Sequence, residues 1–434
     1  MKRNFLIQIS CISLFAFGAV NAISAGELRA GAAKVSITPT PDEFPYQIGR
    51  EKPFVGVHDE VFARALVLDD GKTRVALVVE EVEGIQDPKG TVAQVAQAIG
   101  VPESNVIVSA THTHESLTVF IHGNQLNPAQ QKEIERTRTG AVDAAKQAVA
   151  NLQRARITFG RGEAYVNINN GEQNGIASWY DPKGPVDRTL DLLRVETKSG
   201  QPLAMVVNYG THAETMYRSV VKDGGYEVTG DIPGKVSQIM EANQAGAPVV
   251  LFTAPAEADE LGYFKSFQPA DSSLPEADEG AAGYALMNEM ARRIAAAAFQ
   301  LENAMKEGKS DVTLQAATGI ATCPGGRTRM NNQTHQITTT DGPQVEIALS
   351  VIKINDIAIA GVAADMGNQI GKEIKQASPV PNTMVVSQLA GAVGYILPDA
   401  SYEHPGHGLG GSPIKAGCAE KAIPNGIASI LSSR

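Results

Sequence analysis

The stretch Asn105-Val106-Ile107-Val108-Ser109-Ala110-Thr111-His112-Thr113-His114-Glu115-Ser116 joins an apolar run to two histidines one residue apart. The β-branched residues of the run predict a buried strand that ends just before the histidines. Residues two apart on an extended chain point to the same side, so we expect both imidazoles to face one place beyond the strand. Open α/β sheets bind their ligands at the carboxyl ends of their strands.

Two imidazoles that face one place suit a divalent transition metal, most simply zinc. Zinc needs more than two ligands, so other parts of the chain must supply the rest. Histidines that only form hydrogen bonds in a turn explain the pair equally well. The motif alone therefore leaves both interpretations open.

Two further apolar strands also lead to potential ligands. The run 202–209 is followed by His212, and the hairpin 345–362 is followed by Asp365. Ligands at the ends of separate strands can meet at one edge of a sheet, which favours a metal site over isolated turn histidines.

A fourth strand, 249–252, leads into the acidic loop 254–260. Its members Glu257, Asp259 and Glu260 can act as general bases or metal ligands. Acidic loops are usually solvated, however, and we expect the same here.

The first residues have the pattern of a secretory signal peptide. Lys2 and Arg3 precede an uncharged apolar segment, 5–20, and small residues follow at a cleavage pattern that ends at Ala22, with a second option that ends at Ala25. We expect residues 1–22 to be removed and 23–434 to form one domain in the periplasm or outside the cell. The apolar segment is too short for a comfortable membrane span.

Two cysteines, Cys323 and Cys418, remain after removal of this segment. An even pair in an exported protein suggests a disulfide, although two separate buried thiols are also compatible with the sequence.

Composition limits the class of protein. The chain is 43% hydrophobic and 19% charged, which is typical of a soluble enzyme with a large core. A net charge of −10 argues against a nucleic-acid partner, which needs clustered basic residues. No second apolar run approaches membrane length, so we expect no transmembrane span in the mature chain.

Strand and helix patterns alternate along the chain, which predicts an α/β fold with a mixed β-sheet core flanked by helices. We expect hairpins over 61–79 and 190–209, and a loop over 169–188. The expected helices cover 91–99, 128–152 and 284–301, and a further helix follows the glycine-containing segment 229–234 and ends at about 242.

Several short motifs, in this order, resemble those of the neutral/alkaline ceramidases over most of the mature chain. They lie at 30–39, 62–71, 110–114, 184–188, 208–212, 230–234 and 394–396. The resemblance implies amide hydrolysis at a single zinc ion held by two histidines, a glutamate and a tyrosine.

By motif position, the resemblance implies that His112, His212 and Tyr395 are zinc ligands. Asp365 stands at the position of the glutamate and has one methylene less. The resemblance further implies catalytic roles for His114, near the reacting centre, and for Tyr402.

Two departures from the family bear on the substrate. Leu261 replaces a family serine, and Asn170 stands where an arginine is usual. The sequence also ends soon after the catalytic region, so we expect it to lack the β-sandwich-like tail of true ceramidases. For these reasons we do not favour ceramide as the substrate.

The leading hypothesis is an exported zinc-dependent hydrolase that uses metal-activated water to cleave a small-molecule or lipid-like N-acyl amide. An esterase or lactonase of the same fold is one alternative. A pseudoenzyme that only binds a ligand is another. The oligomeric state does not follow from the sequence.

Overall fold

The computed structural model describes residues 25–47, 50–117, 126–173, 176–269, 275–330, 336–403 and 408–433. The expected signal peptide, 1–22, lies outside the described residues. Among the helices that are described, none is long and apolar enough to cross a membrane.

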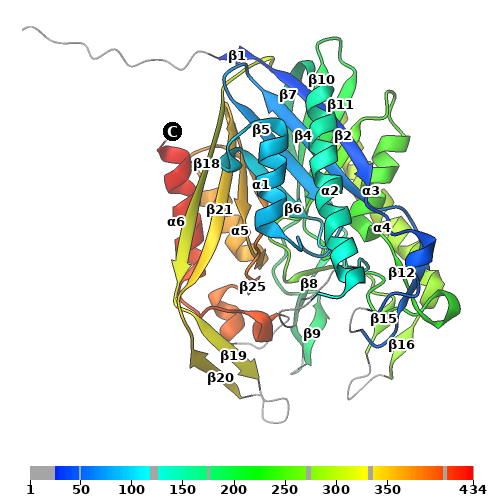
Figure 1. Ribbon diagram of the computed structural model, residues 1–434. Helices are drawn as coiled ribbons and strands as arrows, with labels where there is room; N and C mark the ends of the chain where they lie inside the picture. Colours follow the sequence, from blue (N-terminus) through cyan, green and yellow to red (C-terminus); the bar gives the residue numbers. More distant parts are fainter. Residues whose placement is uncertain are drawn as a thin grey trace, which may run out of the picture.

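Eight strands form the larger sheet, in the order β13-β11-β10-β7-β2-β4-β5-β6 (Figure 1). They are β2 (Arg29–Ser36), β4 (Phe62–Asp69), β5 (Arg74–Glu80), β6 (Val106–Ala110), β7 (Gln153–Glu163), β10 (Thr189–Thr197), β11 (Pro202–Tyr209) and β13 (Val249–Thr253). The two predicted hairpins, β4 with β5 and β10 with β11, are confirmed. The sheet is mixed, because β6 runs parallel to β5 and β13 runs parallel to β11.

Successive residues of the central strands pack into different cores. In β4, Leu66 and Leu68 face one side of the sheet, while Ala65 and Val67 face the other. Since side chains alternate along a strand, a strand covered on both faces is apolar at almost every position. This explains the unbroken apolar runs in the sequence.

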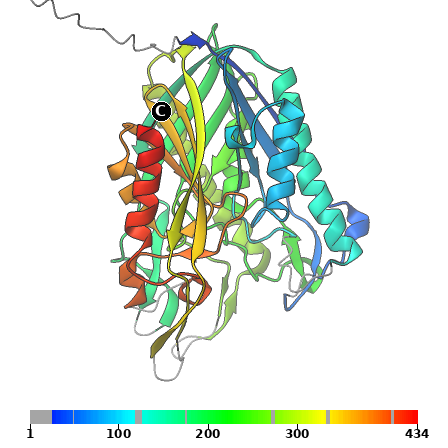
Figure 2. The same cartoon turned by 60° about the vertical axis from the view of Figure 1, so that its left-hand side comes forward.

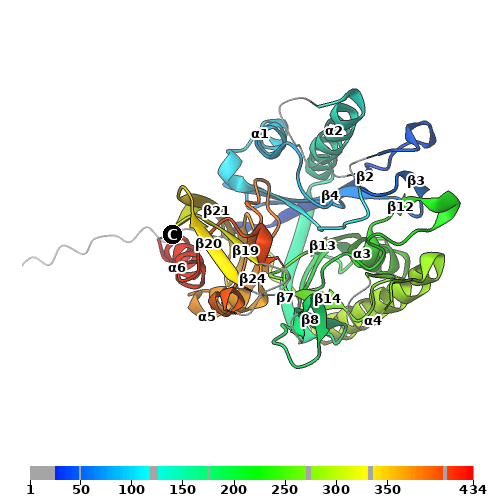
Figure 3. The same ribbon diagram turned by 90° about the horizontal axis from the view of Figure 1, so that it is seen from below.

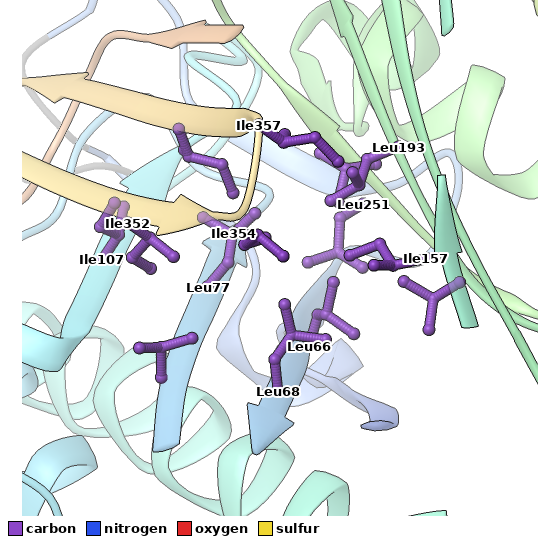
Figure 4. Packing of buried hydrophobic residues seen from close by; sticks show 14 of the residues in the cluster. Leu66, Leu68, Leu77, Ile107, Ile157, Leu193, Leu251, Ile352, Ile354 and Ile357 are labelled. Atoms are coloured by element: carbon purple, nitrogen blue, oxygen red, sulfur yellow. The ribbon is translucent and has the colours of Figure 1, made fainter. Parts of the chain in front are cut away.

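A second sheet of four strands packs against the first. Its order is β18-β21-β22-β24, formed by β18 (Leu314–Cys323), β21 (Val345–Ile354), β22 (Ile357–Val362) and β24 (Asn382–Val386). Figure 4 shows Ile352, Ile354 and Ile357 of this sheet facing the leucine and isoleucine side chains of the larger one. One core therefore lies between the two sheets, and others lie between the sheets and their helices.

Helices cover the outer faces of both sheets (Figures 2 and 3). On the larger sheet lie α1 (Pro88–Ile99), α2 (Pro128–Ala150), α3 (Asp231–Ala242) and α4 (Gly283–Ala304). The smaller sheet is covered by α5 (Asn368–Ala377) and α6 (Ala419–Ser432). The expected α/β fold, a mixed sheet flanked by helices, is confirmed, with a second sheet in addition.

Short strands lie in the segments that follow strands of the two sheets. They are β3 (Phe54–Val57) with β12 (Tyr226–Val228), β8 (Asn167–Gln173) with β9 (Ile176–Asp181) and β14 (Glu260–Gly262), and β23 (Asp365–Met366) with β25 (Tyr395–Ile396). The loop predicted over 169–188 is therefore wrong in part, because it contains the β8–β9 hairpin. Asparagine and glycine have low strand propensity, and the hairpin depends on pairing with the distant strand β14.

The predicted disulfide between Cys323 and Cys418 is present, with an S–S distance of 2.05 Å. It joins the end of β18 to the start of α6, 95 residues further along the chain.

Candidate metal centre and active site

His112 follows β6 at the edge of the larger sheet. The Ala110 N–H donates to the Gln388 carbonyl and the Thr111 N–H to the Glu80 carbonyl, so the strand end is held on both sides. His112 itself has φ 63°, a conformation that is uncommon for a residue with a side chain and that is found most often at functional sites.

The positive φ corrects one expectation. His112 and His114 do not reach one place by simple alternation along an extended strand, since the strand ends at Ala110 and the chain turns at His112. Their rings nevertheless meet, with centroids 4.8 Å apart. The His114 N–H donates to the Ala213 carbonyl, which ties this turn to the loop after β11.

The ring of His112 is oriented by the main chain. Its Nδ1 lies 2.6 Å from the Glu83 carbonyl, which can only accept a hydrogen bond. Nδ1 therefore carries a hydrogen and Nε2 is directed toward Asp365, with Nε2 3.3 Å from Oδ2. A backbone carbonyl that fixes one ring nitrogen is the usual support of a metal-binding histidine.

His212 lies after β11, the strand predicted to deliver it. Its N–H donates to the Glu260 carbonyl, and its Nε2 lies 2.9 Å from Nε2 of His114. Burial and the neighbouring His112 and His212 lower the pKa of His114 well below its usual value.

Asp365 and Tyr395 come from paired strands. They stand opposite each other in the β23–β25 pair, and the Asp365 N–H donates to the Gly394 carbonyl. The Tyr395 ring lies between Gly408 and Gly411, where a Cβ atom would come within 2.5 and 2.7 Å of it. These two glycines leave room for the aromatic ring.

The structure thus brings His112, His212, Asp365 and Tyr395 to one place. Two groups have ligand atoms within 4.8 Å of one another: His112 with His114 and His212, and His212 with Glu257 and Asp365. Burial alone would lower the pKa of His112, but Asp365 and the other nearby carboxylates raise it to about 10. The negative charge of these carboxylates favours the binding of a cation at the centre.

Tyr402 does not join this group. Its hydroxyl is hydrogen-bonded to Ser412 Oγ at 2.7 Å and lies 3.3 Å from the Ile414 carbonyl. Its ring packs in the same small apolar cluster as Tyr395. The catalytic role of Tyr402 remains a prediction.

Glu257, by contrast, is a site residue that the sequence-based interpretation set aside. The expectation of a solvated acidic loop is wrong: Glu257 and Glu260 are both 0% exposed. The loop turns inward because Glu260 accepts hydrogen bonds from Asn167 and from the Asp187 N–H, while Asp259 accepts one from the Asn368 N–H. One feature could have indicated that Glu257 belongs to the site. Glu257 follows β13, and β13 pairs in parallel with β11, the strand that leads to His212.

Other histidines of the chain do not reach the centre, as far as the structure describes them. His58 stacks on Tyr284 with ring centroids 3.4 Å apart. His122, His404 and His407 lie outside the described residues.

A cavity of about 400 Å³ opens above this group of residues. Its polar wall includes Glu83, Gln86 and Gln388, and its apolar wall includes Ile85, Pro88 and Ala392. His112, His114, Asp365 and Tyr395 also line the cavity, so a ligand inside it contacts the candidate centre directly.

The residues fit a zinc ion. The centre offers imidazole and carboxylate donors, which are common zinc ligands, and an open cavity beside them. Neither carboxylate oxygen of Glu257 has a hydrogen-bond partner among the residues that the structure describes, although the side chain is fully buried. Buried carboxylates of this kind are expected to be paired with a cation.

The fold and the site define a class of protein, namely an α/β protein with a buried histidine–carboxylate centre at the carboxyl ends of its strands. Residues 49–313, more than half of the chain, match the family described as neutral/alkaline non-lysosomal ceramidase, N-terminal. The chain belongs to this family. Asp365 and Tyr395 lie beyond the matched residues.

Curated relatives match over part of their length. Neutral ceramidase A of Dictyostelium discoideum is 27% identical over 219 residues, which is 46% of this chain and 29% of that protein. The neutral ceramidase of Drosophila pseudoobscura pseudoobscura is 25% identical over 230 residues, 48% of this chain and 32% of that protein. The matches thus span under a third of the relatives' length.

Solved structures share the fold over nearly the whole chain. A ceramidase complexed with C2 has a TM-score of 0.73 at 15% identity, covering 94% of this chain and 76% of that chain. The neutral ceramidase from Pseudomonas aeruginosa has a TM-score of 0.72 at 16% identity, covering 94% and 75%.

The two residues that the resemblance marks as departures, Leu261 and Asn170, are both buried. The backbone of Leu261 pairs with that of His212, and Leu261 is 2% exposed. The Asn170 N–H donates to the Asp259 carbonyl, and its side-chain amide has no partner among the described residues. An apolar residue thus lies beside one of the candidate metal ligands.

Proposed function

We propose that this chain is a zinc-dependent hydrolase that cleaves the C–N bond of a small N-acyl amide. One observation carries the proposal: His112, His212 and Asp365, from three distant strand ends, lie together beside a single cavity, which His112 and Asp365 line. Membership of the ceramidase family supports an amide as the scissile group.

We assign His112, His212, Asp365 and Tyr395 as the residues that hold the ion. Bound zinc supplies acidified water and polarises a carbonyl group. The Glu83 carbonyl keeps His112 Nε2 directed toward the ion, and the β23–β25 pairing keeps Asp365 beside Tyr395.

His114 is the candidate for proton transfer. Its Nε2 faces the cavity region near His212, and its Nδ1 lies 3.8 Å from Glu83 Oε1. Its lowered pKa keeps the ring neutral and makes a proton taken up at Nε2 easy to pass on to the departing nitrogen of the amide. Tyr402 can assist only if its hydroxyl leaves Ser412.

The cavity suits a small ligand. About 400 Å³ is toward the lower end of the size range of small-molecule sites, and the combination of apolar walls with glutamines suits an acyl group next to a polar amide. Leu261 and Asn170 offer neither a hydroxyl nor a positive charge, and we therefore do not propose ceramide itself. An ester or lactone is the second candidate, since the same centre can polarise an ester carbonyl.

We further propose that residues 1–22 direct export to the periplasm or beyond, and that 23–434 act as one domain. The Cys323–Cys418 disulfide supports an oxidising compartment.

The test is a hydrolysis screen with the zinc-loaded mature protein. We expect release of a free amine from short N-acyl amides, loss of the activity on chelation, and its return with added zinc. Faster turnover of matched esters or lactones would favour the second candidate. Tight binding of an amide without any turnover would favour the ligand-binding alternative.

Gly411 offers a test of how Tyr395 is placed. A Cβ atom at Gly411 would lie 2.7 Å from the Tyr395 ring, so Gly411→Ala should displace that ring. Misplacement of a reacting group by about 1 Å can cost about 100-fold, and we expect kcat/KM to fall by about 10- to 100-fold.

The matched control for this variant is Gly410→Ala. A Cβ atom at Gly410 has nothing within 4 Å, so its kcat/KM should stay close to that of the parent. Equal kcat/KM values for the two variants would show that the position of Tyr395 does not matter for the reaction.

A further inference from the structure

Glu257 occupies a position that hydrophobic packing does not explain. It is fully buried, and burial raises the pKa of its carboxyl group well above the usual value. Within the described part of the chain, neither of its oxygens finds a hydrogen-bond donor. A buried carboxylate without a donor is costly unless a cation compensates its charge.

The main chain holds Glu257 between two of the proposed ligands. The Ala258 N–H donates to the Met366 carbonyl, next to Asp365 in β23. Three residues after Glu257, the Glu260 carbonyl accepts the His212 N–H. The loop is therefore bonded to both the Asp365 strand and the His212 turn.

A third contact anchors the start of the same loop. The Ser387 hydroxyl, after β24, donates to the Pro255 carbonyl at 2.6 Å. With both ends of the loop fixed in this way, the Glu257 side chain is directed at the centre by the backbone.

The ligand atoms are close enough together to converge on one ion. The ligand atoms of His212, Glu257 and Asp365 all lie within 4.8 Å of one another. Two donors on one tetrahedral zinc ion, each at about 2.0–2.2 Å, lie about 3.4 Å apart, so side-chain movements of up to about 1.4 Å would bring these atoms onto one ion.

We propose that Glu257 is a direct ligand of the same divalent transition-metal ion as His212 and Asp365. This inference rests on the metal site proposed above. With Asp365, Glu257 supplies a second negative charge, and two carboxylates balance the charge of a divalent cation in a buried place. The ligand set then combines histidine with two carboxylates.

The test compares zinc affinity in three proteins that have been stripped of metal: the parent chain, Glu257→Gln and Glu80→Gln. Glu80 is the matched control, because it is a buried glutamate outside the two groups of ligand atoms that the described residues form. Competition with a chromophoric chelator measures each dissociation constant. The absorption spectrum of bound Co²⁺ gives a second readout of the coordination geometry.

We expect Glu257→Gln to raise the zinc dissociation constant by more than about 100-fold, since loss of an outer partner alone costs about 10- to 100-fold. The Co²⁺ spectrum should change as well, while Glu80→Gln leaves both unchanged. An affinity and spectrum equal to those of the parent would overturn the inference, as would a loss under about 100-fold with an unchanged spectrum.

Two further outcomes are separable. If the parent chain binds no zinc, the proposed function fails as well. If Glu257→Gln does not fold, Glu257→Asp replaces it, which keeps the charge but shortens the side chain. An unchanged dissociation constant and Co²⁺ spectrum in that variant would then rule out direct coordination.

Discussion

The purified mature chain should contain about one zinc ion, and the double variant His112→Ala, His212→Ala should contain none. These histidines come from different strand ends, and each ring nitrogen faces the candidate centre. Without them His114 is the one imidazole left in the two groups of ligand atoms, and the remaining carboxylates and Tyr395 offer oxygen ligands, which suit Mg²⁺ or Ca²⁺ better than zinc. Elemental mass spectrometry measures the metal content directly.

The same variant should lose amide hydrolysis by more than about 100-fold, because even the loss of an outer partner of a metal site costs about 10- to 100-fold. His58→Ala is the control, since His58 stacks on Tyr284 and is not among the grouped ligand atoms. Full metal content and activity in the double variant would refute the proposed metal site.

Arg64→Met should lower the free energy of unfolding by about 3–5 kcal/mol. Arg64 is fully buried, and its guanidinium donates to Glu81 at 2.7 Å and to Glu241. Methionine fills much of the space but leaves the buried Glu81 without the cation that pairs with it, and leaves Glu241 with only the partly exposed Lys34. That loss of charge compensation, rather than a cavity, sets the size of the effect. Urea unfolding followed by circular dichroism measures it.

Lys34→Met removes another cation from the same Glu241 and serves as the control. Lys34 Nζ lies 2.6 Å from Glu241, but its side chain is 38% exposed. An exposed ion pair contributes little, so we expect a loss of less than about 1 kcal/mol. Similar losses in the two variants would contradict the account based on burial.

Much of the larger sheet was predictable because its strands are covered on both faces. The strand β5 has apolar residues at every position from Val75 to Val79. Such a short unbroken apolar run is typical of a strand that is buried on both faces. Turn residues between β4 and β5 then indicated the hairpin. The neighbours of β6 were not predictable, because pairing between distant strands leaves no local pattern.

Some residues of the candidate site could likewise be predicted from the sequence, whereas one could not. His112, His212 and Asp365 could be nominated because each follows an apolar strand, and the family resemblance added Tyr395. Glu257 was set aside, since nothing in its local sequence distinguishes a buried acidic loop from a solvated one. Its burial depends on hydrogen bonds to β23 and to the turn at His212.

The sequence by itself determined the strands of the larger sheet, most of the helices that cover it and the residue types that end each strand, but not α5, α6 or the β8–β9 hairpin. The features that it determined follow from local side-chain chemistry and the spacing of apolar residues. Only the tertiary structure decided that His112 turns with a positive φ, that Tyr402 bonds to Ser412, and that Glu257 faces the centre. Such features depend on which distant backbone groups meet, and that is settled by the packing of the whole chain.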